Sequence, residues 1–139
     1  MPKFTAQTQV LTHAGVMQML SAAVACAEEI GQPQCIVVVD ASGVTLGQIR
    51  MTGAKFLSLK SAATKACTAA SIRAPSDAIP EGVGPAIAAA TQNAVTRLGG
   101  GLPIMMKGVC LGGIGVGSGS PEQDKEVAMA ALTAIGAGF

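Results

Sequence analysis

The spacing of apolar residues changes from helical to strand-like within the first 51 residues. Residues 12–31 carry apolar side chains three or four positions apart, which predicts a helix ending at Gly31. The run Cys35–Val39 is rich in β-branched residues, and residues 40–43 (Asp-Ala-Ser-Gly) supply turn chemistry. Residues 44–51 return as a second apolar stretch, so this part of the chain predicts an antiparallel hairpin.

The middle of the chain predicts two further helices. Residues 54–71 are rich in alanine, with lysines spaced along them, and favour a helix. Three prolines interrupt the following segment, so residues 76–84 are expected to form an irregular or briefly helical loop. Residues 86–98 return to a helical pattern that stops at three consecutive glycines, residues 99–101.

A second hairpin and a last helix complete the pattern. Strands are expected at 102–106 and 109–117, with a turn near Lys107 and Gly108. The sequence Ser-Pro-Glu-Gln from Ser120 is typical of a helix start, with a capping serine and a glutamine three residues later. The order helix, hairpin, two helices, hairpin, helix indicates an α/β (α+β) fold with an antiparallel sheet covered by helices. We find no repeat or linker and expect one domain over residues 1–139.

Composition narrows the classes of function. The net charge is +1, and the chain has no Trp, no Tyr and three Phe, so no nucleic-acid partner is expected. The first ten residues lack the pattern of a signal peptide, and no segment is predicted to span a membrane, so we expect a cytoplasmic protein. The four cysteines show no metal-binding spacing and are expected to be free thiols.

The scarcity of charge suggests self-association. Only 17 of 139 residues are charged, whereas half are apolar. A small domain has a large surface in relation to its volume, and so few charges cover little of it. We therefore expect a homo-oligomer that buries apolar surface between its copies.

The glycine-rich stretch GGIGVGSGSPEQD, residues 112–124, is the most unusual feature of the sequence. It fits neither the dinucleotide fingerprint nor the Walker loop. Strand alternation puts Gly113, Gly115 and Gly117 on one bare face, which leads to the N-terminus of the last helix and its free amides. We interpret this face as the floor of a ligand pocket with an anion-binding end. The alternative is that a helix packs on the glycines.

Five segments of the chain resemble, in order, the GlcG-like or HbpS-type haem-binding family, which also forms the C-terminal domain of some corrinoid adenosyltransferases. They are VVVDASG (37–43), RMTGA (50–54), SLKSAATKACTAA (58–70), GGLPI (100–104) and GGIGVGSGSPEQDKEVAMAAL (112–132). The resemblance implies a profilin-like, three-layer α/β/α sandwich around a five-stranded antiparallel sheet. It also implies frequent homo-oligomers and haem or a related tetrapyrrole as ligand. The family usually has aspartate where this chain has Thr52, so no role that needs this carboxylate is expected.

We place the predicted pocket between the end of the glycine strand, residues 50–53 and the helix that carries Lys65. Arg50 is expected to bind a carboxylate or propionate, and its alternative is a surface ion pair with Asp40. Lys65 is either a buried base or a lysine whose stem packs while its ammonium reaches water. Asp124 either orients a site residue or stabilises the last helix. The catalytic candidates are Arg50, Lys65 and Asp124, and the binding candidates are Asp40, Arg50, Thr52, Gly53, Gly113, Gly115, Gly117, Ser118 and Glu122.

His13, the only histidine, is a candidate axial ligand for a haem iron, and its alternative is a surface or capping position at the helix start. Two functions follow from these residues. The first is a protein that binds haem or another tetrapyrrole. The second is a cofactor-independent enzyme that carries out acid–base chemistry on a small carboxylated metabolite.

Overall fold

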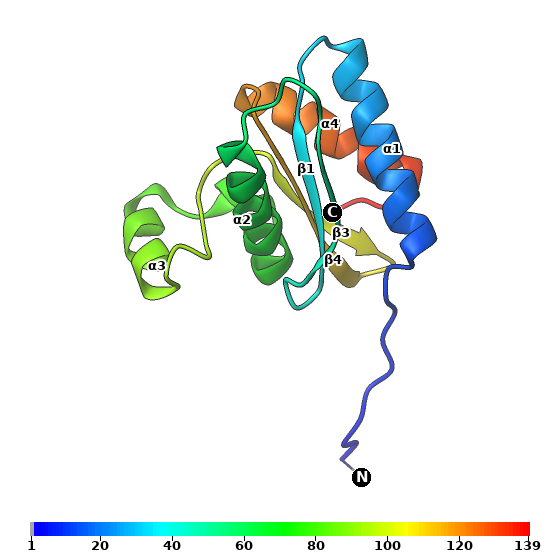
Figure 1. The fold of residues 1–139 in the computed structure, drawn as a ribbon. Coiled ribbons are helices and arrows are strands. Elements are labelled where there is room, and N and C mark those ends of the chain that lie inside the picture. Colours follow the sequence, from blue (N-terminus) through cyan, green and yellow to red (C-terminus); the bar gives the residue numbers. More distant parts are fainter. Residues whose placement is uncertain (1) are drawn as a thin grey trace.

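A computed structural model describes residues 2–139 as an antiparallel sheet between two layers of helices (Figure 1). The helices are α1 (His13–Glu29), α2 (Leu57–Ile72), α3 (Gly84–Ala90) and α4 (Pro121–Ala134). The strands are β1 (Cys35–Asp40), β2 (Thr45–Arg50), β3 (Gly101–Met106) and β4 (Val109–Gly117), and the two short 3₁₀ turns are η1 (Ser76–Ala78) and η2 (Glu81–Val83). The predicted order of helices and hairpins is confirmed.

The sheet has four strands in the order β2-β1-β4-β3, so the expected five-stranded sheet is wrong. Residues 2–10 extend away from the sheet and do not join it (Figure 1). Near the C-terminus, a single antiparallel bridge joins Met105 to Gly138. The described ends of the chain therefore add no fifth strand.

Each face of the sheet has its own apolar core. One face packs against α1 and α4 through side chains such as Met19, Ile36 and Ile114. The other face packs against α2, where the small residues Ala62 and Ala66 meet Val37. This arrangement confirms the three-layer α/β/α sandwich.

The third helix is shorter than the sequence pattern predicts. It ends at Ala90, and the backbone of Gln92 and Asn93 adopts positive φ, so the expected helix over 86–98 is wrong beyond residue 90. The hydroxyl of Thr91 donates to the carbonyl of Ile87, which satisfies one acceptor of the last turn. Among residues 2–139, no helix combines the length and the apolar character that a bilayer-spanning segment requires.

Candidate functional site

The glycine face of β4 is covered by helix α2. A Cβ atom built on Gly115 would lie 1.9 Å from the carbonyl oxygen of Ala62, and one built on Gly113 would lie 2.2 Å from that of Ala66. At Gly117 the nearest atom is the carbonyl oxygen of Ser58, at 3.0 Å. The interpretation of these glycines as an open pocket floor is therefore wrong. They permit the backbone of α2 to approach the sheet, as the alternative interpretation holds.

The start of α4 is occupied by its own side chains. Ser120 Oγ accepts from the amide of Gln123, and Gln123 Oε1 accepts from the amide of Ser120, at 3.2 and 2.9 Å. Asp124 Oδ1 accepts from the amide of Gly119 at 3.1 Å. These amides are thus satisfied within the chain, which contradicts the expected anion-binding end. Glu122 is exposed in the first turn of the helix, where its charge stabilises the helix dipole.

Lys65 and Asp124, two of the catalytic candidates, form a buried ion pair. Lys65 Nζ lies 3.1 Å from Asp124 Oδ2 and donates to the carbonyl oxygen of Val116 at 2.8 Å. The two side chains are only 7% and 3% exposed. Because Gly100 and Gly101 carry no side chains, the lysine can pass the end of β3 and reach α4. The contact joins the helix layers on opposite faces of the sheet.

Gln34 lies near this ion pair, and sequence reasoning did not single it out. The residue is fully buried before β1, and neither atom of its side-chain amide has a hydrogen-bond partner within residues 2–139. A Cβ built on Gly119 would lie 2.8 Å from Gln34 Nε2 and 3.0 Å from Asp124 Oδ1. A single glutamine before an apolar strand gives no sequence signal of such burial.

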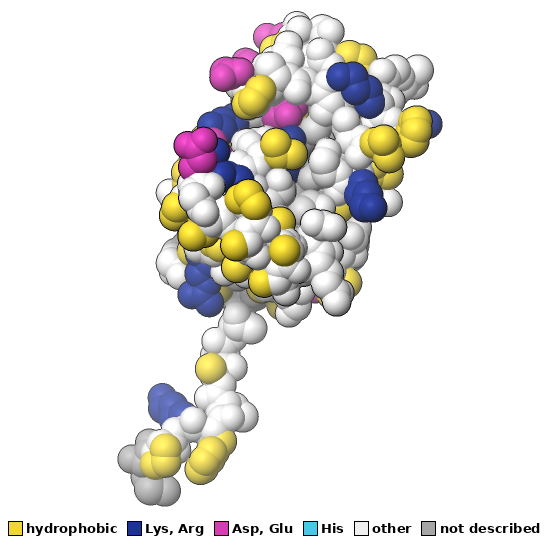
Figure 2. Space-filling model, turned by 90° about the vertical axis from the view of Figure 1, so that its left-hand side faces the viewer, with side chains coloured by type: hydrophobic (Ala, Val, Ile, Leu, Met, Phe, Trp, Pro, Cys, Tyr) yellow, Lys and Arg dark blue, Asp and Glu magenta, His cyan; other side chains and the backbone are white. Residues whose placement is uncertain are grey.

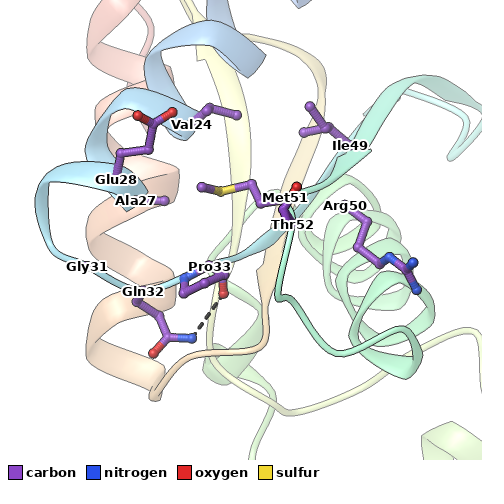
Figure 3. Close-up of a pocket in the computed structure, with 10 residues that line it drawn as sticks. All are labelled: Val24, Ala27, Glu28, Gly31, Gln32, Pro33, Ile49, Arg50, Met51 and Thr52. Carbon is purple, nitrogen blue, oxygen red and sulfur yellow. Dashed lines mark hydrogen bonds between the residues drawn. The ribbon is translucent and has the colours of Figure 1, made fainter.

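A groove between α1 and β2 holds Arg50 and Thr52 (Figure 3). Its volume is about 680 Å³, within the usual range for small-molecule sites. Apolar side chains of Val24, Ile49 and Met51 project into it, whereas the Arg50 guanidinium points away from it (Figure 3). The lining residues are Val24, Ala27, Glu28, Gly31, Gln32, Pro33, Ile49, Arg50, Met51 and Thr52.

Two further binding candidates, Gly53 and Ser118, lie beside this groove. A Cβ on Gly53 would contact Pro33 at 3.4 Å, so Gly53 adjoins the groove wall. Gln32 Nε2 donates to the carbonyl oxygens of Pro33 and Ser118, at 2.9 and 3.2 Å. Ser118 Oγ in turn accepts from the amide of Lys55 at 3.0 Å. The structure thus brings together Arg50, Thr52, Gly53 and Ser118, but not Lys65 or the glycine face.

Asp40 lies at the opposite end of the first hairpin from Arg50. Arg50 pairs with Cys35 at the start of β1, whereas Asp40 is the last residue of that strand. Asp40 Oδ1 accepts from the amides of Ser42 and Val44, at 2.8 and 3.0 Å, and so stabilises the turn. The suggested ion pair between Arg50 and Asp40 is therefore wrong.

Cys35, which pairs with Arg50 across the first hairpin, has a buried thiol. Desolvation raises the pKa of the Cys35 thiol, and the positive charge of Arg50 offsets part of this rise. All four cysteines are free, as the sequence predicted.

His13 does not line the groove that holds Arg50. It is the first residue of α1 and is exposed, and Thr12, not His13, caps the helix by accepting from the amide of Gly15. Glu28, which shares the groove with Arg50, lies 15 residues later in the same helix. At the helical rise this separation is about 22 Å. Met17, one turn after His13, lines a second groove that shares Val24, Glu28 and Ile49 with the first.

Comparison with known proteins gives one consistent result. A family model described as "Haem degrading protein HbpS-like" matches residues 11–133. The corrinoid adenosyltransferase PduO of Citrobacter freundii is 36% identical over 123 residues, which are 85% of this chain and 37% of that protein. The chain therefore spans little more than a third of the length of this relative.

Solved structures agree with the fold described above. A crystal structure of a PduOC–haem complex superimposes with a TM-score of 0.87 at 30% identity, and covers 94% of this chain and 98% of that chain. A crystal structure of HbpS gives a TM-score of 0.83 at 34% identity, with 94% and 93% covered. Both similarities extend over nearly the whole sandwich.

Proposed function

Because this chain belongs to the HbpS-like family, we propose that it binds haem or a closely related tetrapyrrole. The single observation that supports this most is its similarity, over 94% of its length, to a structure solved as a haem complex. The similar proteins give no support to the alternative of a cofactor-independent enzyme.

The groove between α1 and β2 suits the two parts of such a ligand. A tetrapyrrole has a flat apolar body, and Val24 and Ile49 offer an apolar wall. Its carboxylates need a cation, and Arg50 lies at the rim on the edge strand. Rotation of the Arg50 side chain toward the groove would bring the guanidinium to a propionate. Thr52 adds a hydroxyl at the same rim.

His13 is the candidate ligand of the iron, which supplies redox chemistry when haem is bound. His13 is exposed at the start of α1 and lines neither groove, whereas Arg50 lines the groove together with Glu28, which lies about 22 Å farther along the same helix. We therefore propose that His13 and Arg50 meet at one haem only when they come from different copies of the chain.

Titration of the pure protein with haem, followed by its Soret absorbance, tests the proposal. We expect saturable binding that Ile49→Glu weakens by about tenfold or more, because the variant puts an unpaired carboxylate in the apolar wall. Arg50→Gln should weaken binding by about tenfold, the loss of one charged hydrogen bond.

Ile87→Glu is the matched control for the groove variant. Ile87 on α3 is 38% exposed and Ile49 is 39% exposed, but Ile87 lines neither of the two grooves along α1. The control should bind haem as the unmodified protein does. If the unmodified protein shows no saturable Soret change, the proposed function is wrong. If both glutamate variants bind normally, the ligand lies outside the α1–β2 groove.

A further inference from the structure

The chain carries an extended arm that contacts almost nothing. Residues 2–10 are exposed throughout, and within residues 2–139 no backbone hydrogen bond joins them to another segment. Phe4 is 94% exposed and Val10 is 77% exposed. Figures 1 and 2 both show the arm projecting from the body, and apolar side chains lie along it in Figure 2. Large apolar side chains in this position indicate a surface that another molecule covers.

The sequence of the arm has the alternation of a half-buried strand. In Phe-Thr-Ala-Gln-Thr-Gln-Val, residues 4–10, the odd positions Thr5, Gln7 and Gln9 are polar. The even positions carry Phe4, Ala6, Thr8 and Val10, which are mostly apolar. Threonine, valine and phenylalanine all favour strands. An extended segment with this pattern gains stability by pairing with the edge of a sheet.

The sheet has one blocked edge and one open edge. On β3, Met105 exchanges both backbone hydrogen bonds with Gly138, at 2.8 and 3.0 Å. Pro103 lies two residues earlier, so it presents the same side of the strand and has no amide hydrogen to donate there. The outer edge of β3 therefore cannot accept a regular added strand.

The outer edge of β2 lacks both features that block β3, namely a paired segment and a proline. Apart from Arg50 at its end, β2 (Thr-Leu-Gly-Gln-Ile-Arg) contains no charge and no proline, and within residues 2–139 it pairs only with β1. Natural proteins usually protect such an edge with charges, proline or a covering segment. Exposed apolar side chains flank it as well: Met17, Val44, Leu46 and Ile49.

From the unattached arm and the open edge, we propose that the arm of one copy adds as a fifth strand to the β2 edge of a second copy. The apolar side of the arm then lies next to Met17 and Ile49 on the α1 side of that copy and extends the apolar wall of the groove. The polar side faces the same way as Gln48. The proposal commits to a second copy of this chain, because the arm points away from the β2 edge of its own molecule (Figure 1). It does not depend on the haem proposal.

Disulfide trapping between two differently labelled variants tests this pairing. Gln7→Cys lies at the centre of the arm and Gln48→Cys near the centre of β2, and both sites are exposed. After the two variants are mixed and oxidised, we expect a covalent dimer that contains one chain of each. Gln7→Cys mixed with Thr133→Cys is the matched control, because Thr133 is exposed on α4. That mixture should yield at least tenfold less covalent dimer.

A second measurement uses no cysteine. Phe4→Asp with Val10→Asp should lower the mass in solution by light scattering. The circular dichroism spectrum should be unchanged, because Phe4 and Val10 are exposed and residues 2–10 make no backbone hydrogen bond to another described segment. Equal trapping at positions 48 and 133, or no trapped dimer at all, would overturn the proposal. An unchanged mass for the double aspartate variant would overturn it too. Normal haem binding with failed trapping would refute the pairing alone.

Discussion

Gly115 shows how much of this fold depends on one missing side chain. The Cβ of an alanine there would lie 1.9 Å from the carbonyl oxygen of Ala62, and both atoms belong to rigid backbone elements. We expect Gly115→Ala to lower the free energy of unfolding by about 3 kcal/mol, since α2 must move away from the sheet. Chemical denaturation measures this loss.

Gly82→Ala is the control for this substitution. No described atom of residues 2–139 lies within 4 Å of a Cβ at Gly82, and the backbone of Gly82 does not require glycine. Its unfolding free energy should stay within about 0.5 kcal/mol of the unmodified protein. A Gly115→Ala variant as stable as Gly82→Ala would mean that α2 does not rest on the glycines of β4.

Among the elements, α2 and α4 are joined by the ion pair between Lys65 and Asp124. Removing one partner leaves a buried charge without compensation, so Lys65→Met and Asp124→Asn should each cost about 3–5 kcal/mol in the free energy of unfolding. The double variant should lose much less than the two single losses together. Denaturation of the four proteins gives the coupling energy.

The ion pair between Lys125 and Asp77 provides the comparison at the surface. Both of its side chains are more than a third exposed, so water screens the interaction. Lys125→Met should cost less than about 1 kcal/mol. If Lys65→Met were no more harmful than Lys125→Met, the buried pair would not hold the helix layers together.

The elements of this fold could be predicted from local patterns, but the candidate site could not. Strand alternation and the capping sequence at Ser120 gave correct strands and a correct start for α4. Those patterns are local, because they arise from neighbouring backbone positions. The same alternation identified the bare face of β4 but not what covers it. Whether α2 covers this face depends on packing between residues such as Ala62 and Gly115, which are distant in sequence.

Arg50 shows a second limit of prediction from the sequence: its own position could be predicted, but the residues across the groove could not. Its position at the end of a hairpin was evident, and a role at a groove rim agrees with its place in the structure. The residues opposite it, Val24 and Glu28, come from α1 and carried no signal of their own. A groove between a helix and an edge strand appears only when both are placed in space.

At the scale of the whole molecule, the separation of His13 from Arg50 has a consequence for assembly. Suppose that a haem uses His13 of one copy and Arg50 of another. In an assembly made of one variant alone, every such site then lacks either His13 or Arg50. His13→Ala and Arg50→Gln should therefore each bind haem more weakly than the unmodified protein. His13→Ala should also shift the Soret maximum, because it removes the iron's histidine ligand.

Mixing the two variants should restore binding. In a mixed assembly, a chain with His13→Ala still offers Arg50, and a chain with Arg50→Gln still offers His13. In a mixed dimer with two equivalent sites, one site regains both residues, so up to half of the sites in that species should bind normally. Haem titration of the mixture, after time for exchange of copies, measures this recovery. Binding equal to the average of the two separate variants would show that each site is complete within one chain, and that His13 and Arg50 do not share a ligand.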